Sequence, residues 1–174
     1  MAVYLFTYHA YRSWMPDRRQ GYVERGKGIL PQDHDKATLY NARAVNNAVA
    51  FEEEVRWAAI DAVDEIAQKN DWLLYEVATD ASHIHVLVGW RGFQPWKEVS
   101  NRLKRGVGLH LSHAMDRPGP WFSRGSSRKR IKDRRHFEYL LNDYLPAHGD
   151  IRWTRRHTRE TTADMHPQLL EADD

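Results

Sequence analysis

The amino-acid sequence predicts an α+β domain with an antiparallel sheet at its centre. Three observations predict it. Polar and apolar residues alternate around position 85 as in a strand, two longer segments repeat apolar residues every three or four positions as in helices, and strands and helices alternate along the chain. With 41% hydrophobic residues, seven Trp and eight Tyr, the 174 residues can bury a core. We expect one domain over residues 1–153 and a polar, flexible tail over residues 154–174.

The first part of the chain is predicted to contain a strand, a long loop and a helix. Residues 3–11 are rich in β-branched and aromatic side chains, which favour a strand. Residues 13–35 hold two Pro, three Gly and many charges, which indicates a loop. In residues 41–69 the apolar side chains fall on one stripe, which predicts a helix.

A hairpin is predicted next, with strands at residues 71–79 and 82–90 joined by a two-residue connection. In that register Glu76 lies opposite His85, where its carboxylate could orient an imidazole or approach a metal ion. A loop one residue longer would change this register.

The second half continues with a helix over residues 96–114 and a short strand at 121–123 that a basic run interrupts. Asp133 is a suitable N-cap for a third helix over residues 134–144, and residues 150–153 add an edge element. Strand–helix–strand–strand–helix–strand is the order of a ferredoxin-like, RRM-like sheet with helices on one face. The predicted helix over residues 134–144 is an addition to these six elements.

The central strand carries two histidines. His83 and His85 are two residues apart, so on a strand they share one face, opposite Ile84 and Val86. Two imidazoles about 6–7 Å apart along a strand can bind one metal ion. Because the apolar side chains should pack under the helices, we expect the histidines on the open face of the sheet.

Basic residues gather in one part of the chain although the net charge is only +2. Residues 102–135 contain eleven Lys and Arg against two Asp, which favours a polyanionic partner, with nucleic acid first. A solvated charged loop is the other interpretation. The candidate DNA contacts are Arg102, Lys104, Arg105, Arg124, Arg128, Lys129, Arg130, Lys132, Arg134 and Arg135.

Several classes of protein are excluded. The absence of cysteine rules out disulfides and thiolate metal sites. No apolar run is long enough to span a bilayer and no signal peptide is evident, so we expect a cytoplasmic protein that is associated with the nucleoid if it binds DNA.

The residues alone leave the chemistry of the histidine pair open. A histidine-triad hydrolase would need a third histidine where this chain has Leu87. A phosphodiester site with metal-bound histidines and a tyrosine nucleophile uses the most features. A non-catalytic module that binds single-stranded nucleic acid on its sheet, and a metal phosphoesterase that uses water, are the alternatives.

The stretch His83, Ile84, His85 resembles the histidine–hydrophobe–histidine motif of the HUH single-tyrosine transposases, in particular the REP-associated tyrosine transposases and their transposase-like relatives. As in that family, a helix well after the motif carries a tyrosine. Residues 131–137 resemble the lead-in to that helix, 145–149 the stretch after it, and 7–21 the first strand with its Trp-Pro loop. The resemblance covers roughly residues 3–153.

This resemblance implies an endonuclease and strand transferase that cuts and rejoins single-stranded DNA at or near hairpins. The implied cofactor is Mg²⁺ or Mn²⁺, and the implied intermediate is a 5′-phosphotyrosine. Tyr139 is the implied nucleophile, with Tyr144 as its rival. Members of the family act as monomers or as dimers, so a homodimer stays open.

The resemblance also implies the metal ligands. His83 and His85 are the first two. Asp143 follows Tyr139 by four residues, where relatives often carry Gln or Asn, and is the expected third ligand. Glu76 and His148 are the other candidates.

Overall fold

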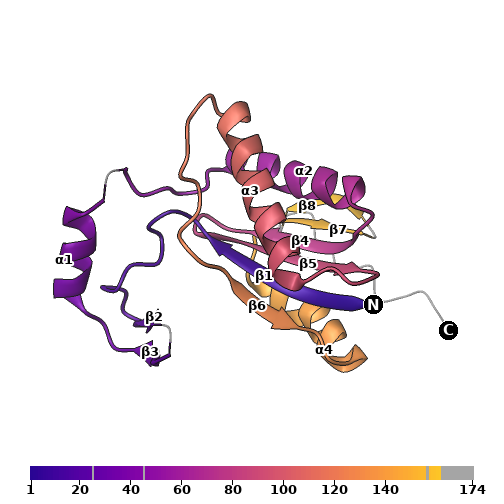
Figure 1. The fold of residues 1–174 in the computed structure, drawn as a ribbon, viewed down its shortest axis with the longest axis horizontal. Helices are drawn as coiled ribbons and strands as arrows, with labels where there is room; N and C mark the ends of the chain where they lie inside the picture. The colour runs from indigo at the N-terminus through magenta and orange to yellow at the C-terminus, as the bar shows by residue number, and fades with distance from the viewer. Residues whose placement is uncertain (25, 45, 156, 162–174) are drawn as a thin grey trace.

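In the computed structural model, six strands form one antiparallel sheet in the order β6–β1–β5–β4–β7–β8 (Figure 1). These strands are β1 (Ala2–His9), β4 (Leu73–Thr79), β5 (His83–Trp90), β6 (Ser127–Arg130), β7 (Ile151–Thr154) and β8 (His157–Thr161). The structure describes residues 1–161 except 25, 45 and 156, and only the backbone of 157–161. The predicted α+β, ferredoxin-like arrangement is confirmed, with β7 and β8 added at one edge.

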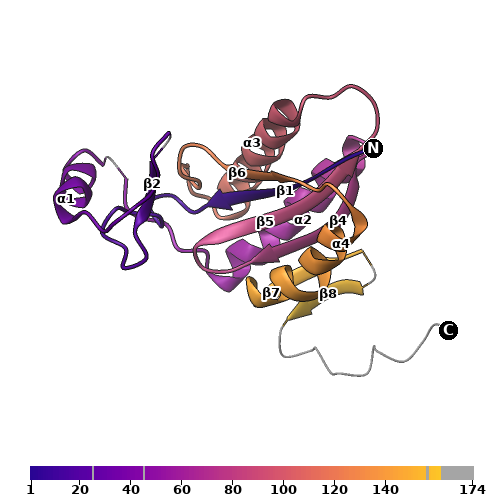
Figure 2. The same cartoon turned by 90° about the horizontal axis from the view of Figure 1, so that it is seen from below.

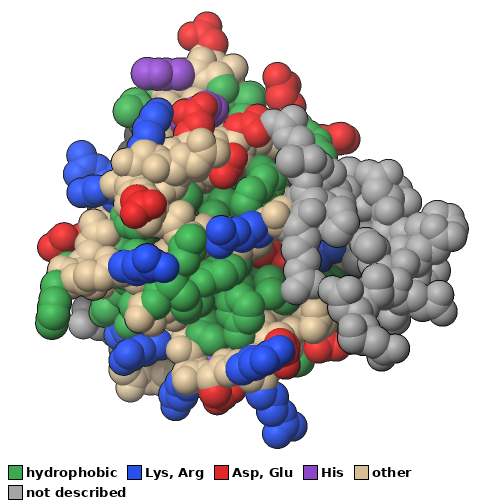
Figure 3. Space-filling model, turned by 90° about the vertical axis from the view of Figure 1, so that its right-hand side faces the viewer, with side chains coloured by type: hydrophobic (Ala, Val, Ile, Leu, Met, Phe, Trp, Pro, Cys, Tyr) green, Lys and Arg blue, Asp and Glu red, His purple; other side chains and the backbone are tan. Residues whose placement is uncertain are grey.

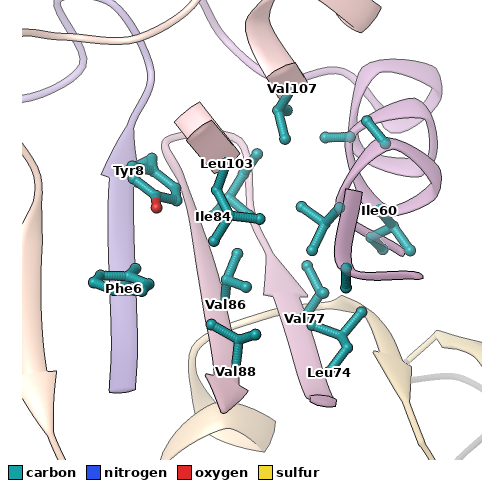
Figure 4. Close-up of a cluster of buried hydrophobic side chains, with 14 of the residues drawn as sticks. Phe6, Tyr8, Ile60, Leu74, Val77, Ile84, Val86, Val88, Leu103 and Val107 are labelled. Atoms are coloured by element: carbon teal, nitrogen blue, oxygen red, sulfur yellow. The ribbon is translucent and has the colours of Figure 1, made fainter. Parts of the chain in front are cut away.

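Two helices cover one face of the sheet, α2 (Glu53–Lys69) and α3 (Trp96–Ala114). Ile84, Val86 and Val88 of β5 point to this face and are buried beneath the helices (Figure 4). The side of α3 that meets this core consists of Val99, Leu103, Val107 and Leu111. Burying one such side chain contributes about 1.5–3 kcal/mol, so this layer supplies most of the apolar stabilisation.

A third helical segment lies on the opposite face of the sheet, where Figure 1 shows α4 below and α2 and α3 above. The segment starts as α4 (Arg134–Tyr139), passes through a π-helical turn η1 (Leu140–Tyr144) and ends as α5 (Leu145–Ala147). Leu140 and Leu145 are fully buried in a second hydrophobic cluster. The sheet side of this cluster consists of Leu5, Ala78 and Leu87. The segment with the tyrosines is therefore packed on the face that carries the histidines.

One part of the chain stands to the side of the sheet. It consists of the hairpin β2 (Tyr22–Glu24) and β3 (Gly28–Leu30), followed by α1 (His34–Ala42). Figures 1 and 2 both show it beside the end of β1, away from the helices. Among the described residues, no helix is long and apolar enough to cross a membrane.

Three predicted elements need correction. The single helix expected over residues 41–69 is two helices, α1 and α2, and the described residues between them, 43, 44 and 46–52, are not helical. Residues 121–123 form no strand beyond an isolated bridge between Ala10 and Phe122, and the basic run itself forms β6. The predicted loop 13–35 contains the hairpin β2–β3. Past the expected domain end at residue 153, β8 continues the sheet to residue 161, and residues 162–174 of the expected tail lie outside the described part.

The register of the β4–β5 hairpin also differs from the prediction. Glu76 lies opposite Leu87, and Ala78 lies opposite His85. The turn is centred one residue later than expected, because the backbone N–H of Asp80 donates to the carbonyl of His83 at 3.1 Å. Glu76 therefore lies on the same face of the sheet as the histidines, but its partner on β5 is two residues farther along than predicted.

Candidate nucleic-acid processing site

The histidine face is built by three neighbouring strands. On β1, Thr7 lies opposite His85 and His9 lies opposite His83. Partners that lie opposite one another point to the same side of a sheet, so these four side chains share one face. On the other side of β5, Ala78 occupies the position next to His85, and it is fully buried in one cluster with Leu140 and Leu145.

The turn before β5 fixes the ring of His83. Asp80 accepts hydrogen bonds from the backbone N–H of Ser82 at 2.6 Å and from that of His83 at 2.8 Å. Its carboxylate also lies 2.9 Å from Nδ1 of His83, and Oγ of Ser82 lies 2.8 Å from the same nitrogen. With a carboxylate as acceptor, Nδ1 of His83 carries the proton, and the lone pair is on Nε2.

Oγ1 of Thr7 lies 2.9 Å from Nδ1 of His85, and when this hydroxyl accepts the hydrogen bond, the lone pair of His85 is on Nε2. The Nε2 atoms of His83 and His85 then face each other at 2.8 Å. Two lone pairs at this distance repel one another unless a cation or a shared proton lies between them. The pair is thus oriented to bind a positive charge.

Burial keeps His85 neutral. Burial first, and then the neighbouring His83, lowers the pKa of His85 to about 3. The same two causes, in the same order, lower the pKa of His9 to about 4. For Asp80, burial raises the pKa, but hydrogen bonds from His83 and Ser82 outweigh this and hold it below its usual value. Neutral imidazoles are the form that binds metal ions.

The histidine pair fits a divalent ion. Two nitrogens each about 2.1 Å from one ion and at right angles to each other lie about 3.0 Å apart, close to the observed 2.8 Å. Hydrogen bonds at both Nδ1 atoms are the outer contacts that metal-binding histidines usually have. Within the described residues, however, no group of three or more His, Asp or Glu side chains comes together as a metal site.

The helical segment brings Tyr144 and His148 to the pair. The ring of Tyr144 lies 5.5 Å from that of His85, and the ring of His148 lies 5.9 Å from it. Tyr144 and His148 stack on one another at 4.0 Å. Nδ1 of His148 lies 2.7 Å from the carbonyl oxygen of Tyr144, so it donates there and leaves its Nε2 as the lone-pair nitrogen.

Tyr139 lies beyond Tyr144 as seen from the histidine pair. It is 50% exposed, and its ring is 6.4 Å from that of Tyr144. The π-helical turn explains why these two tyrosines are neighbours: its hydrogen bonds join residues five apart, and the tyrosines are five residues apart. Partial burial raises the pKa of Tyr144, and the nearby Tyr139 adds to this effect.

Of the predicted further ligands, His148 lies beside the pair, whereas Asp143 and Glu76 do not join it. Asp143 is exposed and forms no metal-binding group with the histidines within the described residues. Glu76 is buried in an ion pair with Arg152, at 3.0 Å from its Nη1. These acids are thus placed differently from the expectation.

The predicted DNA-contact residues divide between the two faces. Arg102, Lys104 and Arg105 are on α3, on the face away from the histidines. Lys104 donates to the backbone carbonyls of Ser123 and Gly125, so it holds a loop in place. Arg102 donates to the side chain of Asn70.

The basic residues of β6 alternate between the faces. Lys129 lies opposite Leu5, so it points to the histidine face, whereas Arg128 and Arg130 point to the other. The guanidinium of Arg128 lies 3.7 Å from the ring centre of Trp96 on α3. Of the rest, Arg124 is exposed before β6, and Lys132, Arg134 and Arg135 are exposed just before and at the start of α4. In Figure 3, the Lys and Arg side chains lie apart from each other around a hydrophobic area on the face shown.

Sequence reasoning missed Thr7 and His9. The available signal was the alternation in the first strand, where both belong to the same face as Leu5. The contact itself depends on the pairing of β1 with β5, which the sequence does not specify.

Two solved structures are similar in fold. One is a candidate transposase from Deinococcus radiodurans, at 13% identity and a TM-score of 0.49, covering 86% of this chain and 93% of that chain. The other is a REP-associated tyrosine transposase bound to a REP hairpin, at 13% identity and a TM-score of 0.46, covering 83% of this chain and 64% of that one. Both of those proteins are described as transposases. No protein-family model and no curated protein matches the chain.

Proposed function

We propose that this protein cuts and rejoins single-stranded DNA through a covalent phosphotyrosine. The observation that carries the proposal is the docking of the tyrosine segment on the histidine face, with the ring of Tyr144 5.5 Å from that of His85. A nucleophile and a cation site next to each other are what a phosphodiester transfer requires. An ordinary binding module needs neither.

Tyr144 is the nucleophile in this proposal. Sequence reasoning favoured Tyr139, but the ring of Tyr139 is in contact with Tyr144, whereas Tyr144 is in contact with the histidine pair. Tyr139 is exposed at the rim, where it can meet an unpaired base. Both tyrosines come from the same chain as the histidines, so the proposed site is complete in one protomer.

In this proposal His83 and His85 would hold the divalent ion, Mg²⁺ or Mn²⁺, through their Nε2 atoms. His148 is proposed as a further ligand. Its ring lies next to that of His85, and its Nδ1 is hydrogen-bonded to the carbonyl of Tyr144, which leaves Nε2 for the ion. The bound ion supplies positive charge that polarises the scissile phosphate. Thr7 and Asp80 keep the two imidazoles in the orientation that presents Nε2.

The chemistry is a phosphoryl transfer to tyrosine. The phenolic oxygen of Tyr144 attacks phosphorus, the bond from phosphorus to the 3′-oxygen breaks, and the phenolic proton is released as the 3′-oxygen gains one. The products are a 5′-phosphotyrosine and a free 3′-hydroxyl. A tyrosine is a better leaving group than a sugar hydroxyl, since its pKa is near 10, so a 3′-hydroxyl can reverse the step without ATP.

The substrate class follows from charge and from the resemblance. Lys129 on the histidine face and the exposed cations before α4 can neutralise phosphates of a strand that crosses the site. The preference for DNA hairpins rests on the resemblance to the REP-associated transposases.

The proposal is tested with 5′- and 3′-labelled single-stranded hairpin DNA and Mn²⁺ on denaturing gels. We expect a protein–DNA adduct from the unaltered chain and from His113→Ala, an exposed histidine on the opposite face. Tyr144→Phe and His85→Ala should give none, and Tyr139→Phe should retain it. Cleavage without an adduct would instead indicate a phosphoesterase that uses water, and binding alone would indicate a binding module.

A further inference from the structure

Two polar atoms beside the histidine pair are buried and have no hydrogen-bond partner among the described residues. They are Nδ1 of His9 and Nη1 of Arg18. His9 is on the histidine face, opposite His83, and the two rings are 5.6 Å apart. Buried N–H groups without a partner are costly, so such atoms often mark the position of a ligand.

Trp14 connects these two residues. Its ring lies 4.6 Å from that of His9, and the guanidinium of Arg18 lies 4.1 Å from its ring centre. A guanidinium that stacks on an indole keeps its N–H donors free at its edge. The stack therefore holds the guanidinium of Arg18 near His9, with its Nη1 buried and without a hydrogen-bond partner among the described residues.

The loop that carries Trp14 is fixed to the sheet. Ser13 donates through Oγ to the carbonyl of Ala10 at 3.0 Å and to that of Ser82 at 2.9 Å. The second of these carbonyls belongs to the turn before His83. The positions of Trp14 and His83 are thus linked through Ser13.

We propose that His9, Trp14 and Arg18 form a subsite for the phosphate of a nucleotide that flanks the cut. Arg18 donates to the phosphate oxygens through its free edge, Trp14 holds the guanidinium flat, and His9 donates through Nδ1. On the other side of the pair lies Tyr144, so the strand passes from Tyr144 across the histidines to Arg18. This inference rests on the proposed function, since it assigns the neighbour of the scissile phosphate.

The subsite is tested by binding, without cleavage. The fluorescence anisotropy of single-stranded hairpin DNA is measured without divalent ions at several salt concentrations. Arg18→Ala should weaken binding about tenfold and lower the slope of log K against log salt by about 1. Arg19→Ala, the exposed neighbour, is the matched control and should change neither.

Uncharged phosphate analogues identify the phosphate that Arg18 contacts. Methylphosphonates replace the phosphates of the oligonucleotide one at a time, and one position should weaken binding to the unaltered protein but not to Arg18→Ala. Trp14→Ala should lose as much affinity as Arg18→Ala, and the double variant no more, because Trp14 acts through the guanidinium. Circular dichroism melting confirms that each variant is folded.

The outcomes separate the two proposals. If the unaltered protein forms the adduct but no phosphate couples to Arg18, or Arg19→Ala matches Arg18→Ala, the subsite is wrong and the proposed function stands. If Arg18 couples to a phosphate but no adduct forms, the subsite stands and the covalent chemistry is wrong. If the unaltered protein does not bind the DNA, both are wrong.

Discussion

The orientation of each imidazole is decided by its Nδ1 partner. Asp80 lies at Nδ1 of His83, Thr7 at Nδ1 of His85, and a backbone carbonyl at Nδ1 of His148. All three rings can therefore present Nε2 as the lone-pair nitrogen. This common pattern is a stronger sign of a cation site than the spacing of two histidines on a strand.

Substitution of Thr7 tests this pattern. Thr7→Val removes the oxygen at Nδ1 of His85, and we expect the affinity for Mn²⁺ to fall about 10- to 100-fold in titrations followed by electron paramagnetic resonance. Thr7→Ser keeps the hydroxyl and should bind Mn²⁺ as the unaltered protein does. Equal affinity in Thr7→Val and Thr7→Ser would show that this contact does not orient the ring.

The histidine pair could be predicted from sequence because strand alternation is a local property. The partners at Nδ1 could not be predicted with it. Thr7 is 78 positions away from His85 and meets it only through sheet pairing, and Asp80 was expected to be a simple turn residue.

At the scale of the element, the π-helical turn decides which side chains reach the histidines. In a regular α-helix, residues four apart share a face, which was the basis for pairing Tyr139 with Asp143. In η1 the residues five apart lie together, so Tyr144 is the neighbour of Tyr139. Sequence patterns predicted a helix there, but a π-helical turn has no simple sequence signal.

Gly149 lets the end of this segment approach the sheet. A Cβ atom at this position would lie 2.8 Å from Cβ of Ala78 and 2.8 Å from the backbone nitrogen of Thr79. We expect Gly149→Ala to lower the free energy of unfolding by about 1–3 kcal/mol, measured by urea denaturation. Adduct formation should fall as well, since His148 is the adjacent residue.

A second glycine is the control for this substitution. Gly106 is unsuitable because it is packed against Ile66, and Gly125 has open space around its Cβ position but a φ of +79°. Gly108→Ala is the better comparison, because a Cβ atom there would lie 3.9 Å from the nearest atoms of Phe122, an ordinary contact. If Gly149→Ala is as stable and as active as the unaltered protein, the close approach has no role.

At the scale of the whole molecule, the six-stranded sheet separates two surfaces. One face is covered by α2 and α3, and the other carries the histidines, the tyrosines and Lys129. The basic block read from the sequence is divided between these surfaces, because strand β6 alternates its side chains and α3 lies on the far face. Charge counting could predict a polyanionic partner but not the face that binds it.

This division predicts unequal effects of two charge removals. Lys129→Ala should weaken binding of single-stranded DNA and lower the salt slope by about 1, because Lys129 points to the histidine face. Arg105→Ala, which removes an exposed charge on α3, should leave both unchanged. Anisotropy titrations from low to high salt measure the two variants. An equal loss in both would mean that the DNA does not favour the histidine face.

The most direct measurement is to locate the DNA-linked tyrosine. The unaltered protein is incubated with hairpin DNA and Mn²⁺, digested with nuclease and trypsin, and sequenced by mass spectrometry. Trypsin releases residues 136–152 as one peptide, which holds both Tyr139 and Tyr144. We predict a nucleotide phosphate on Tyr144 that is lost in His85→Ala. A nucleotide on Tyr139, or cleaved DNA with no modified tyrosine, would contradict the account.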